Sequence, residues 1–170
     1  MRIRLKGWSQ IVDSYDRFTD ETTVELITPV RLPSTSEVLT GNETSVTLWI
    51  VARAKGPAFK DPVFGLALQI ETNRPAALPL FEAKPIYFLY DDQRFVLEKT
   101  ARVPDLERRA MAASRSRDAM FVGGAVDLAQ IEKFGSSKSV ELKISGMEIR
   151  LKPEMIASLK AYTEYVRKKL

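Results

Sequence analysis

The sequence predicts a mainly β protein, a β-sandwich or a bent antiparallel sheet, with a short helix and a C-terminal α-helix packed on it. β-Branched and aromatic runs punctuated by Pro, Gly, Asn and Asp fill the first hundred residues. Two hairpin patterns and one strongly amphipathic final segment complete the signal. With 170 residues and 45% apolar content, the chain can bury one core, so we expect a single domain, residues 1–170.

The first third of the chain contains two strand patterns. YDRFTDETTVEL, residues 15–26, is typical of a strand, a turn and a second strand. Pro29 cannot donate to a ladder, so we expect the second strand to break or bend there, or to lie at an edge. Residues 45–54, SVTLWIVARA, alternate with bulk on both faces, which predicts a central strand.

The middle of the chain predicts one strand and one hairpin. After a loop, residues 63–72 resume the extended pattern, and an irregular link follows. IYFLYDDQRFVL, residues 86–97, predicts a hairpin turning at Asp91 and Asp92, because Asp tolerates the left-handed backbone of a tight turn. The pattern weakens over residues 104–113, which we interpret as a loop between strands.

A further strand and a short helix are predicted next. RDAMFVGGAVD is strand-like, and Gly123 and Gly124 permit a bulge or a close backbone approach. This glycine pair lacks the Lys-Ser/Thr signature of a phosphate loop. DLAQIEKFG predicts a helix capped by Asp127, with Gly135 at its C-terminal stop.

The last two predicted elements are a hairpin and a helix. SVELKISGMEIRL alternates apolar and polar residues around a turn at Ser145-Gly146, so one face of this hairpin is expected to be buried and the other exposed to solvent. Residues 153–169 predict the C-terminal helix, with Pro153 at its first position and basic residues at its end. Its apolar stripe must pack on a sheet; it comprises Met155, Ile156, Leu159, Tyr162 and Val166.

Composition excludes several function classes. The chain has no cysteine and no histidine, which removes disulfides, thiolate zinc sites, cysteine nucleophiles and histidine bases or ligands. Serine–histidine triads and cysteine–histidine dyads would need a partner to supply the missing group. We therefore expect no cofactor and assign no catalytic or metal-binding residue.

Two carboxylate hypotheses remain beside a structural interpretation. Asp13, Asp16, Asp20 and Glu21 could ligate calcium, but their spacing lacks the alternation and glycine of a calcium loop, so a turn is the favoured interpretation. A hydrolase would need converging carboxylates, for example Asp16 with Glu82 or Glu98.

A cluster of arginines is the candidate anion-binding site. Arginine suits bidentate recognition of phosphates or acidic partners, and the net charge is +4, although acidic residues are interleaved. No nucleic-acid-binding motif accompanies the cluster, so nucleic acid is not the expected partner. The candidate anion-binding residues are Arg102, Arg108, Arg109, Arg115 and Arg117.

The aromatic residues of the predicted strands and of the N-terminal segment are expected to pack in the core. They are Trp8, Trp49, Tyr87, Phe88, Tyr90 and Phe95.

The compartment depends on whether Met1 is the natural start. No apolar run is long enough to form a transmembrane segment, and MRIRLKGWSQ has no apolar core of signal-peptide length. If Met1 was added to a mature domain, we expect a periplasmic or envelope location, and if it is native, a cytoplasmic one.

Three motifs in order resemble an uncharacterised family of bacterial β-rich domains, often exported or lipid-anchored. They are Y-D-R-F-x-D-x-T-T-V from Tyr15 to Val24, the hairpin IYFLYDDQRFVL, and DLAQIEKFGSSKSVELKISGMEIRL leading into PEMIASLKAYTEYV. The resemblance implies a β-rich fold and no assigned activity. This chain departs from it with Asp92 at a usual glycine position and without a lipobox cysteine.

The function expected from these observations is a non-enzymatic binding or structural module, possibly of the bacterial cell envelope. The alternative is a cytosolic module that binds an anionic partner through the Arg102–Arg117 region. A carboxylate-based hydrolase is the third hypothesis.

Overall fold

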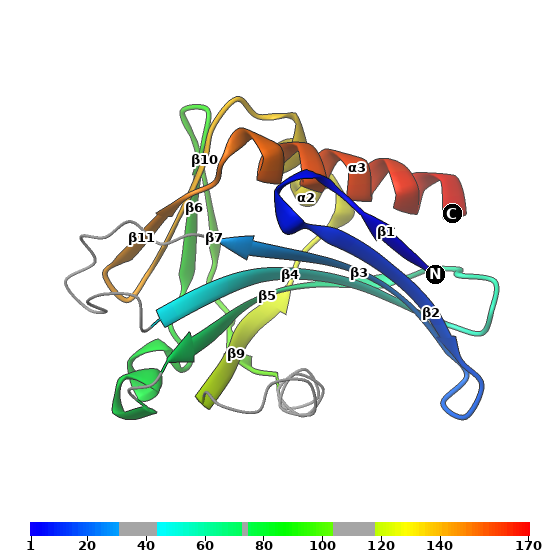
Figure 1. Cartoon of the computed structure of the whole chain (residues 1–170), viewed down its shortest axis with the longest axis horizontal. Coiled ribbons are helices and arrows are strands. Elements are labelled where there is room, and N and C mark those ends of the chain that lie inside the picture. Colours follow the sequence, from blue (N-terminus) through cyan, green and yellow to red (C-terminus); the bar gives the residue numbers. More distant parts are fainter. Residues whose placement is uncertain (31–43, 73–74, 104–117) are drawn as a thin grey trace.

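The computed structural model describes residues 1–30, 44–72, 75–103 and 118–170. Within these residues the strands form a seven-stranded antiparallel sheet and a four-stranded antiparallel sheet, here called the large sheet and the small sheet. Figure 1 shows both sheets with two helices above the concave side of the large sheet. The predicted mainly β architecture with a C-terminal helix is confirmed.

The large sheet has the strand order β1-β2-β3-β4-β5-β9-β8. Its long central strands follow the predicted alternation, and β4 pairs with both β3 and β5, as its two bulky faces predicted. The strands are β1 (Arg2–Arg4), β2 (Gln10–Asp16), β3 (Glu21–Val30), β4 (Thr44–Lys55), β5 (Val63–Thr72), β8 (Ala101–Arg102) and β9 (Asp118–Ala125).

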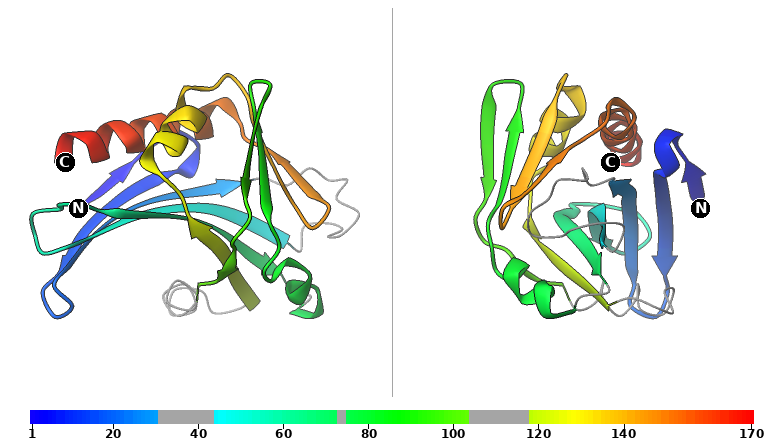
Figure 2. Two further views of the ribbon diagram at one scale, coloured as in Figure 1. Left: turned by 180° about the vertical axis from the view of Figure 1, so that it is seen from behind. Right: turned by 60° about the vertical axis from the view of Figure 1, so that its left-hand side comes forward.

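The small sheet is built from the two predicted hairpins, in the order β11-β10-β6-β7. Left-handed backbone closes both turns, at Asp91 (φ 41°) and Asp92 (φ 25°) and at Ser145 (φ 45°) and Gly146 (φ 80°). Figure 2 shows this sheet standing at an angle to the large one. Its strands are β6 (Ile86–Tyr90), β7 (Gln93–Leu97), β10 (Val140–Ile144) and β11 (Met147–Arg150).

Two α-helices lie on the same side of the large sheet as the small sheet. They are α2 (Leu128–Ser136) and α3 (Pro153–Lys169), which begins and ends where the sequence predicted. Phe134 of α2 stacks on Phe88 of the small sheet with ring centroids 4.7 Å apart, and Tyr162 of α3 is fully buried. One apolar cluster therefore joins both sheets and both helices.

Two local predictions were wrong in part. Pro29 does not break β3, but it does lie at a local edge, which was the alternative expectation. β2 stops pairing at Ile27, so Pro29 pairs with β4 alone and its missing N–H is tolerated. Gly135 does not end α2, which continues to Ser136. A Cβ at Gly135 would lie 2.7 Å from the backbone nitrogen of Lys160, so this glycine permits close packing of α2 on α3.

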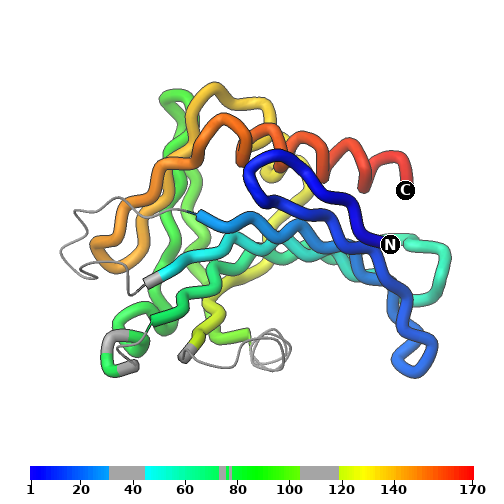
Figure 3. The backbone as a smooth tube through the Cα atoms, in the orientation of Figure 1, coloured from blue at the N-terminus to red at the C-terminus, as the bar shows by residue number. Residues whose placement is uncertain are grey.

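The N-terminal segment also differs from the prediction. A short strand, β1, and a 3-10 helix, η1 (Lys6–Trp8), precede β2, and a second 3-10 helix, η2 (Pro75–Phe81), occupies the predicted irregular link. Trp8 was predicted to pack in the core but is 86% exposed. Figure 3 traces this segment along the edge of the large sheet. The predicted loop over residues 104–113 lies outside the described residues.

Candidate functional site

An open groove of about 680 Å³ lies on the outward face of the small sheet. Its position follows from strand alternation: Ile86, Phe88 and Tyr90 of β6 are buried, so Tyr87 and Leu89 point outward. Leu89 is 52% exposed, although it is a large apolar side chain on a central strand. The groove therefore has a partly apolar floor facing solvent.

Strand register arranges the outward side chains of the groove in two rows. In one row Leu89 lies between Arg94 of β7 and Glu141 of β10, and Arg150 of β11 lies beyond Glu141. In the second row Tyr87 lies beside Lys143, which pairs with Glu148 across the hairpin. Apolar groups therefore lie on the central strand and charged groups lie around them.

The charges of the groove are unequally matched. Arg150 contacts Glu141 at 2.8 Å, and Lys143 contacts Glu148 at 2.6 Å, so both carboxylates already have a cation. The guanidinium carbon of Arg94 lies 5.1 Å from the centre of the Tyr87 ring in a cation–π contact. Within the part of the chain that the structure describes, Arg94 has no ion-pair partner. It is therefore the cation of this groove that remains available to an external carboxylate.

Asp91 and Asp92, at the end of the same hairpin, were interpreted as turn residues, and their backbone confirms this. One carboxylate oxygen of Asp91 accepts hydrogen bonds from the backbone N–H groups of Lys138 at 2.9 Å and Ser139 at 3.1 Å. The side chain thus ties the β6–β7 turn to the segment that precedes β10.

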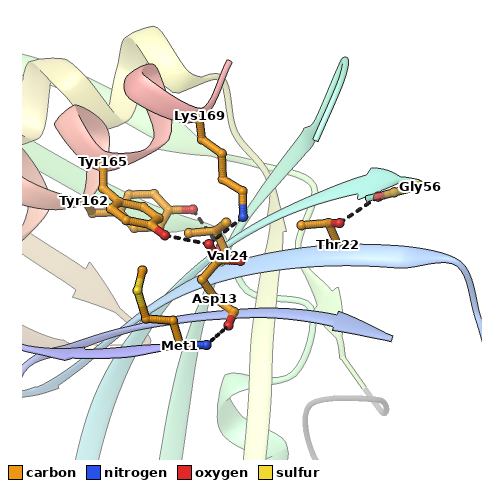
Figure 4. Close-up of polar contacts among 8 residues, drawn as sticks. All are labelled: Met1, Asp13, Thr22, Val24, Gly56, Tyr162, Tyr165 and Lys169. Carbon is orange, nitrogen blue, oxygen red and sulfur yellow. Dashed lines mark hydrogen bonds and ion pairs between the residues drawn. The ribbon is translucent and has the colours of Figure 1, made fainter. Parts of the chain in front are cut away.

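A second polar cluster joins β2 to the end of α3 (Figure 4). Asp13 Oδ2 accepts a hydrogen bond from the Tyr165 hydroxyl at 2.5 Å and contacts the Lys169 ammonium at 2.5 Å. The N-terminal ammonium of Met1 donates to the backbone carbonyl of Asp13. This cluster brings together residues that the sequence did not associate.

The hydrogen bonds of this cluster decide its protonation. Burial alone would raise the pKa of Asp13, but the hydrogen bonds from Lys169 and Tyr165 outweigh it, so the pKa of Asp13 lies below its usual value. Burial, and then the bond to the Asp13 carboxylate, raises the pKa of Tyr165 to about 12. Asp13 is therefore held ionised and Tyr165 is held neutral. These protonation states favour a role in holding β2 and α3 together over a role in proton transfer.

The other carboxylates near Asp13 are dispersed. Asp16 accepts from the backbone N–H of Phe18 at 2.8 Å, Asp20 accepts from the Tyr15 hydroxyl at 2.8 Å, and Glu21 lies 3.9 Å from Arg53. Among the described residues no group of three or more acidic side chains is arranged to hold a metal ion. Asp16 and Asp20 therefore serve the turn, as expected, whereas Glu21 lies in β3 beside Arg53 of β4 and Asp13 lies within β2.

The first carboxylate pair considered for a hydrolase does not converge. Asp16 ends β2, at the same end of the large sheet as the start of β5, whereas Glu82 follows η2, beyond the other end of β5. Ten strand residues span about 30 Å, and Figure 1 shows the two segments at opposite ends of the large sheet. Glu98 follows β7 of the small sheet and is exposed.

Of the five candidate anion-binding arginines, the structure describes one. Arg102 is an exposed residue of β8 and lines, with Arg53, a concavity of about 320 Å³ on the outer face of the large sheet. The floor of this concavity consists of small residues such as Gly65, Ala67 and Gly123. Arg108, Arg109, Arg115 and Arg117 lie outside the described residues.

Sequence reasoning missed the groove, although its signal was present. The alternation in IYFLY places Tyr87 and Leu89 on the face opposite to Phe88, and only the tertiary structure tells which face is solvent-exposed. Tyr87 was predicted to pack in the core and instead lines the groove, whereas Phe88 and Tyr90 are buried as predicted.

Comparisons with known proteins do not place the chain in a family. No protein-family model, no curated protein and no solved structure matches it. None of the helices in the described residues has the length and apolar character needed to cross a bilayer.

Proposed function

We propose that this chain is a non-enzymatic binding module whose groove on the small sheet receives the surface of another protein. The partner would set an apolar side chain on Leu89 and Tyr87 and a carboxylate beside Arg94. The observation that carries the proposal is the 52% exposed Leu89, which lies in register with Arg94, a cation with no ion-pair partner among the described residues.

The shape of the groove favours a macromolecular partner over a small molecule. Small-molecule sites are concave and enclose roughly 70–90% of the ligand surface, whereas this groove is open along the sheet face. An apolar centre with a charged rim is the usual anatomy of a protein interface. Tyr and Arg, both present here, are enriched among the residues that dominate binding energy.

Charge complementarity predicts an acidic partner. Three cations and two carboxylates line the groove, and both carboxylates are already paired with Arg150 and Lys143. A partner carboxylate would therefore meet Arg94 without displacing an existing ion pair. An electrostatic match of this kind contributes to partner choice and association rate.

Titrating the ¹⁵N-labelled chain with two synthetic peptides tests the proposal. One peptide carries Leu beside Asp, and the other carries Asn in place of that Asp. We expect amide shifts confined to β6, β7 and β10, and affinity about two- to fivefold higher for the Asp peptide, since an ion pair with the exposed Arg94 contributes roughly 0.2–1 kcal/mol.

Matched variants make this test specific. Arg94→Glu should remove the preference for Asp, whereas Arg4→Glu makes the same charge change on exposed β1 and should not. Leu89→Ser should weaken both peptides, whereas Leu80→Ser, at a leucine 53% exposed in η2, should not. Shifts located elsewhere, or a preference that survives Arg94→Glu, would contradict the proposal.

Two further expectations from the sequence stay predictions, a location of the module in the cell envelope and the binding of an anionic partner. Binding of an anionic partner is favoured by the placement of Arg102 and Arg53 around one concavity. Retention on heparin at moderate salt would support the anionic partner, and elution at low salt would count against it.

A further inference from the structure

The small sheet ends in a strand with one open edge. Its order is β11-β10-β6-β7, so β7 pairs with β6 on one side and has no strand partner on the other among the described residues. The right-hand view of Figure 2 shows the β6–β7 hairpin at the margin of the molecule. An open edge presents unpaired N–H and C=O groups that can pair with another chain. The edge itself therefore specifies an extended backbone as its occupant.

Strand register shows which backbone groups of β7 face the open edge. Residues of an antiparallel strand direct their N–H and C=O groups alternately to one side and to the other. The Asp91 N–H donates to the Ser139 carbonyl at 3.3 Å, so the odd-numbered residues of β6 face β10 and the even-numbered ones face β7. Phe95 lies opposite an even-numbered residue and therefore bonds to β6. Arg94 and Val96 direct their groups to the open edge, where no described residue bonds to them.

A concavity of about 640 Å³ lies beside this edge, on the side of the small sheet that α2 covers. Among the described residues of the small sheet, Phe95 alone lines it, and the rest of the lining comes from β5, β9, α2 and the segments next to them. Phe95, Phe64 and Leu128 are half-buried and pack against the common core. The core is therefore open to solvent beside the edge strand.

We propose that β7 receives an extended segment of another protein as an added strand, with an apolar side chain in this concavity and a carboxylate beside Arg94. The residue of the added strand opposite Phe95 would point to the same side as Phe95, into the concavity. Its two neighbours would pair with Arg94 and Val96 and point to the opposite face. There Arg94 is exposed and has no ion-pair partner among the described residues, which favours an acidic residue opposite it.

A second copy of the chain fits this edge less well. The sequence of β7 is QRFVL, which contains no acidic residue. Pairing of two β7 strands about Phe95 would place each Arg94 opposite Val96 and leave both guanidinium groups without a carboxylate. The added strand shares Arg94 with the groove, but it depends on the backbone of β7 and on the concavity, so it does not rest on the proposed function.

A peptide modified only in its backbone tests the added strand. The probe is Ac-Thr-Val-Glu-Leu-Thr-Val-Thr-NH₂, in which Leu would enter the concavity, and Glu and the Thr after Leu would pair with β7. We expect hydrogen exchange at the amides of Arg94 and Val96 to slow at least about tenfold when the peptide saturates the chain. Exchange measured by NMR with and without the peptide gives this ratio.

N-methylation of the probe separates the backbone from the side chains. Methyl groups on the nitrogens of Glu and of the Thr after Leu remove the two donors that face β7, so affinity should fall at least about tenfold. Methyl groups on the nitrogens of Leu and of the second Val, which face away from β7, should change affinity by less than about threefold. Both modified peptides keep every side chain of the probe.

A proline at the open edge separates this site from the groove. Val96→Pro removes an N–H that makes no bond to β6, so the hairpin should fold, as circular dichroism would show, and affinity for the probe should fall at least about tenfold. Arg4→Pro makes the same change at the open edge of β1 and should leave this affinity unchanged. Val96→Pro keeps the Arg94 side chain, so the preference of the groove for the Asp peptide should persist.

Three results would overturn the proposal. They are amides of Arg94 and Val96 that the probe does not protect, equal affinity for the two N-methylated peptides, and a folded Val96→Pro variant that binds the probe as the parent does. Protection that depends on protein concentration without the probe would also overturn it, because the edge would then pair with a second copy. Protected edge amides without a preference of the groove for the Asp peptide would contradict the proposed function alone. The N-methylated peptides use the parent chain, so they decide the question even if Val96→Pro fails to fold.

Discussion

Asp13 shows how a residue from an apparent acidic cluster can serve the fold. Its side chain is 14% exposed and accepts from both Tyr165 and Lys169 of α3, more than 150 positions along the chain. The Lys169 ammonium also lies 5.2 Å from the centre of the buried Phe59 ring. The carboxylate therefore fastens the last turn of α3 to β2, and Lys169 adds a contact with Phe59 of the β4–β5 loop.

Removing the Asp13 charge should weaken the fold in a pH-dependent way. Asp13→Asn loses a charge-assisted pair that is partly exposed, so we expect the free energy of unfolding at neutral pH to fall by about 1 kcal/mol. The pKa of Asp13 is lowered from its ordinary value of 3.8, so the stabilisation is present above that pH and is lost as the pH falls through the folded pKa. Denaturant titrations across acidic pH should show the two proteins converging.

A matched variant separates this effect from ordinary surface charge. Glu148→Gln removes the carboxylate of an exposed pair, with Lys143 55% and Glu148 71% exposed. Its effect on the free energy of unfolding should stay below about 0.5 kcal/mol at any pH. An Asp13→Asn difference that does not change at acidic pH would argue that packing, not charge, is lost.

At the scale of elements, the contact between α2 and α3 depends on a missing side chain. A Cβ at Gly135 would meet the backbone of Lys160 and Leu159 at 2.7 to 3.1 Å. Backbone cannot rotate away as a flexible side chain can, so the two helices would have to separate. The buried face of α2 also carries Phe134, whose ring contacts Phe88, Tyr90 and Phe95 of the small sheet.

Gly135→Ala should therefore destabilise the protein although alanine is the better helix former. We expect a loss of about 1–3 kcal/mol, the usual cost of overpacking, measured by chemical denaturation. Ala157→Gly, at an exposed position of α3, measures the effect of helix propensity alone. We expect it to lower the free energy of unfolding by about 0.5–1 kcal/mol. A stabilised Gly135→Ala variant would show that α2 and α3 can adjust without loss.

At the scale of the whole molecule, local pattern predicted most strands, the two hairpins and α3, but not the contacts between elements far apart in the sequence. Alternation in residues 45–54 and 86–97 was enough to place β4, β6 and β7, because the period of a strand is local information. The role of Gly135 depends on Lys160, which is 25 positions away, and the ion pair of Asp13 depends on Lys169, which is 156 positions away. The groove was missed for the same reason, since exposure of Leu89 follows from what the other face of β6 packs against.

The shared core leads to a prediction for the whole chain, that both sheets unfold as one unit. The Tyr162 hydroxyl on α3 donates to the carbonyl of Val24 in β3 at 3.1 Å, and burial, with the nearby charge of Glu25, raises the pKa of Tyr162. Tyr162→Phe should cost about 1 kcal/mol. Hydrogen exchange should report the same loss at the slowest amides of β4 in the large sheet and β10 in the small sheet. Tyr15→Phe removes an exposed hydroxyl and should leave both unchanged. A loss confined to the large sheet would mean that the two sheets unfold independently, contrary to the single domain predicted for residues 1–170.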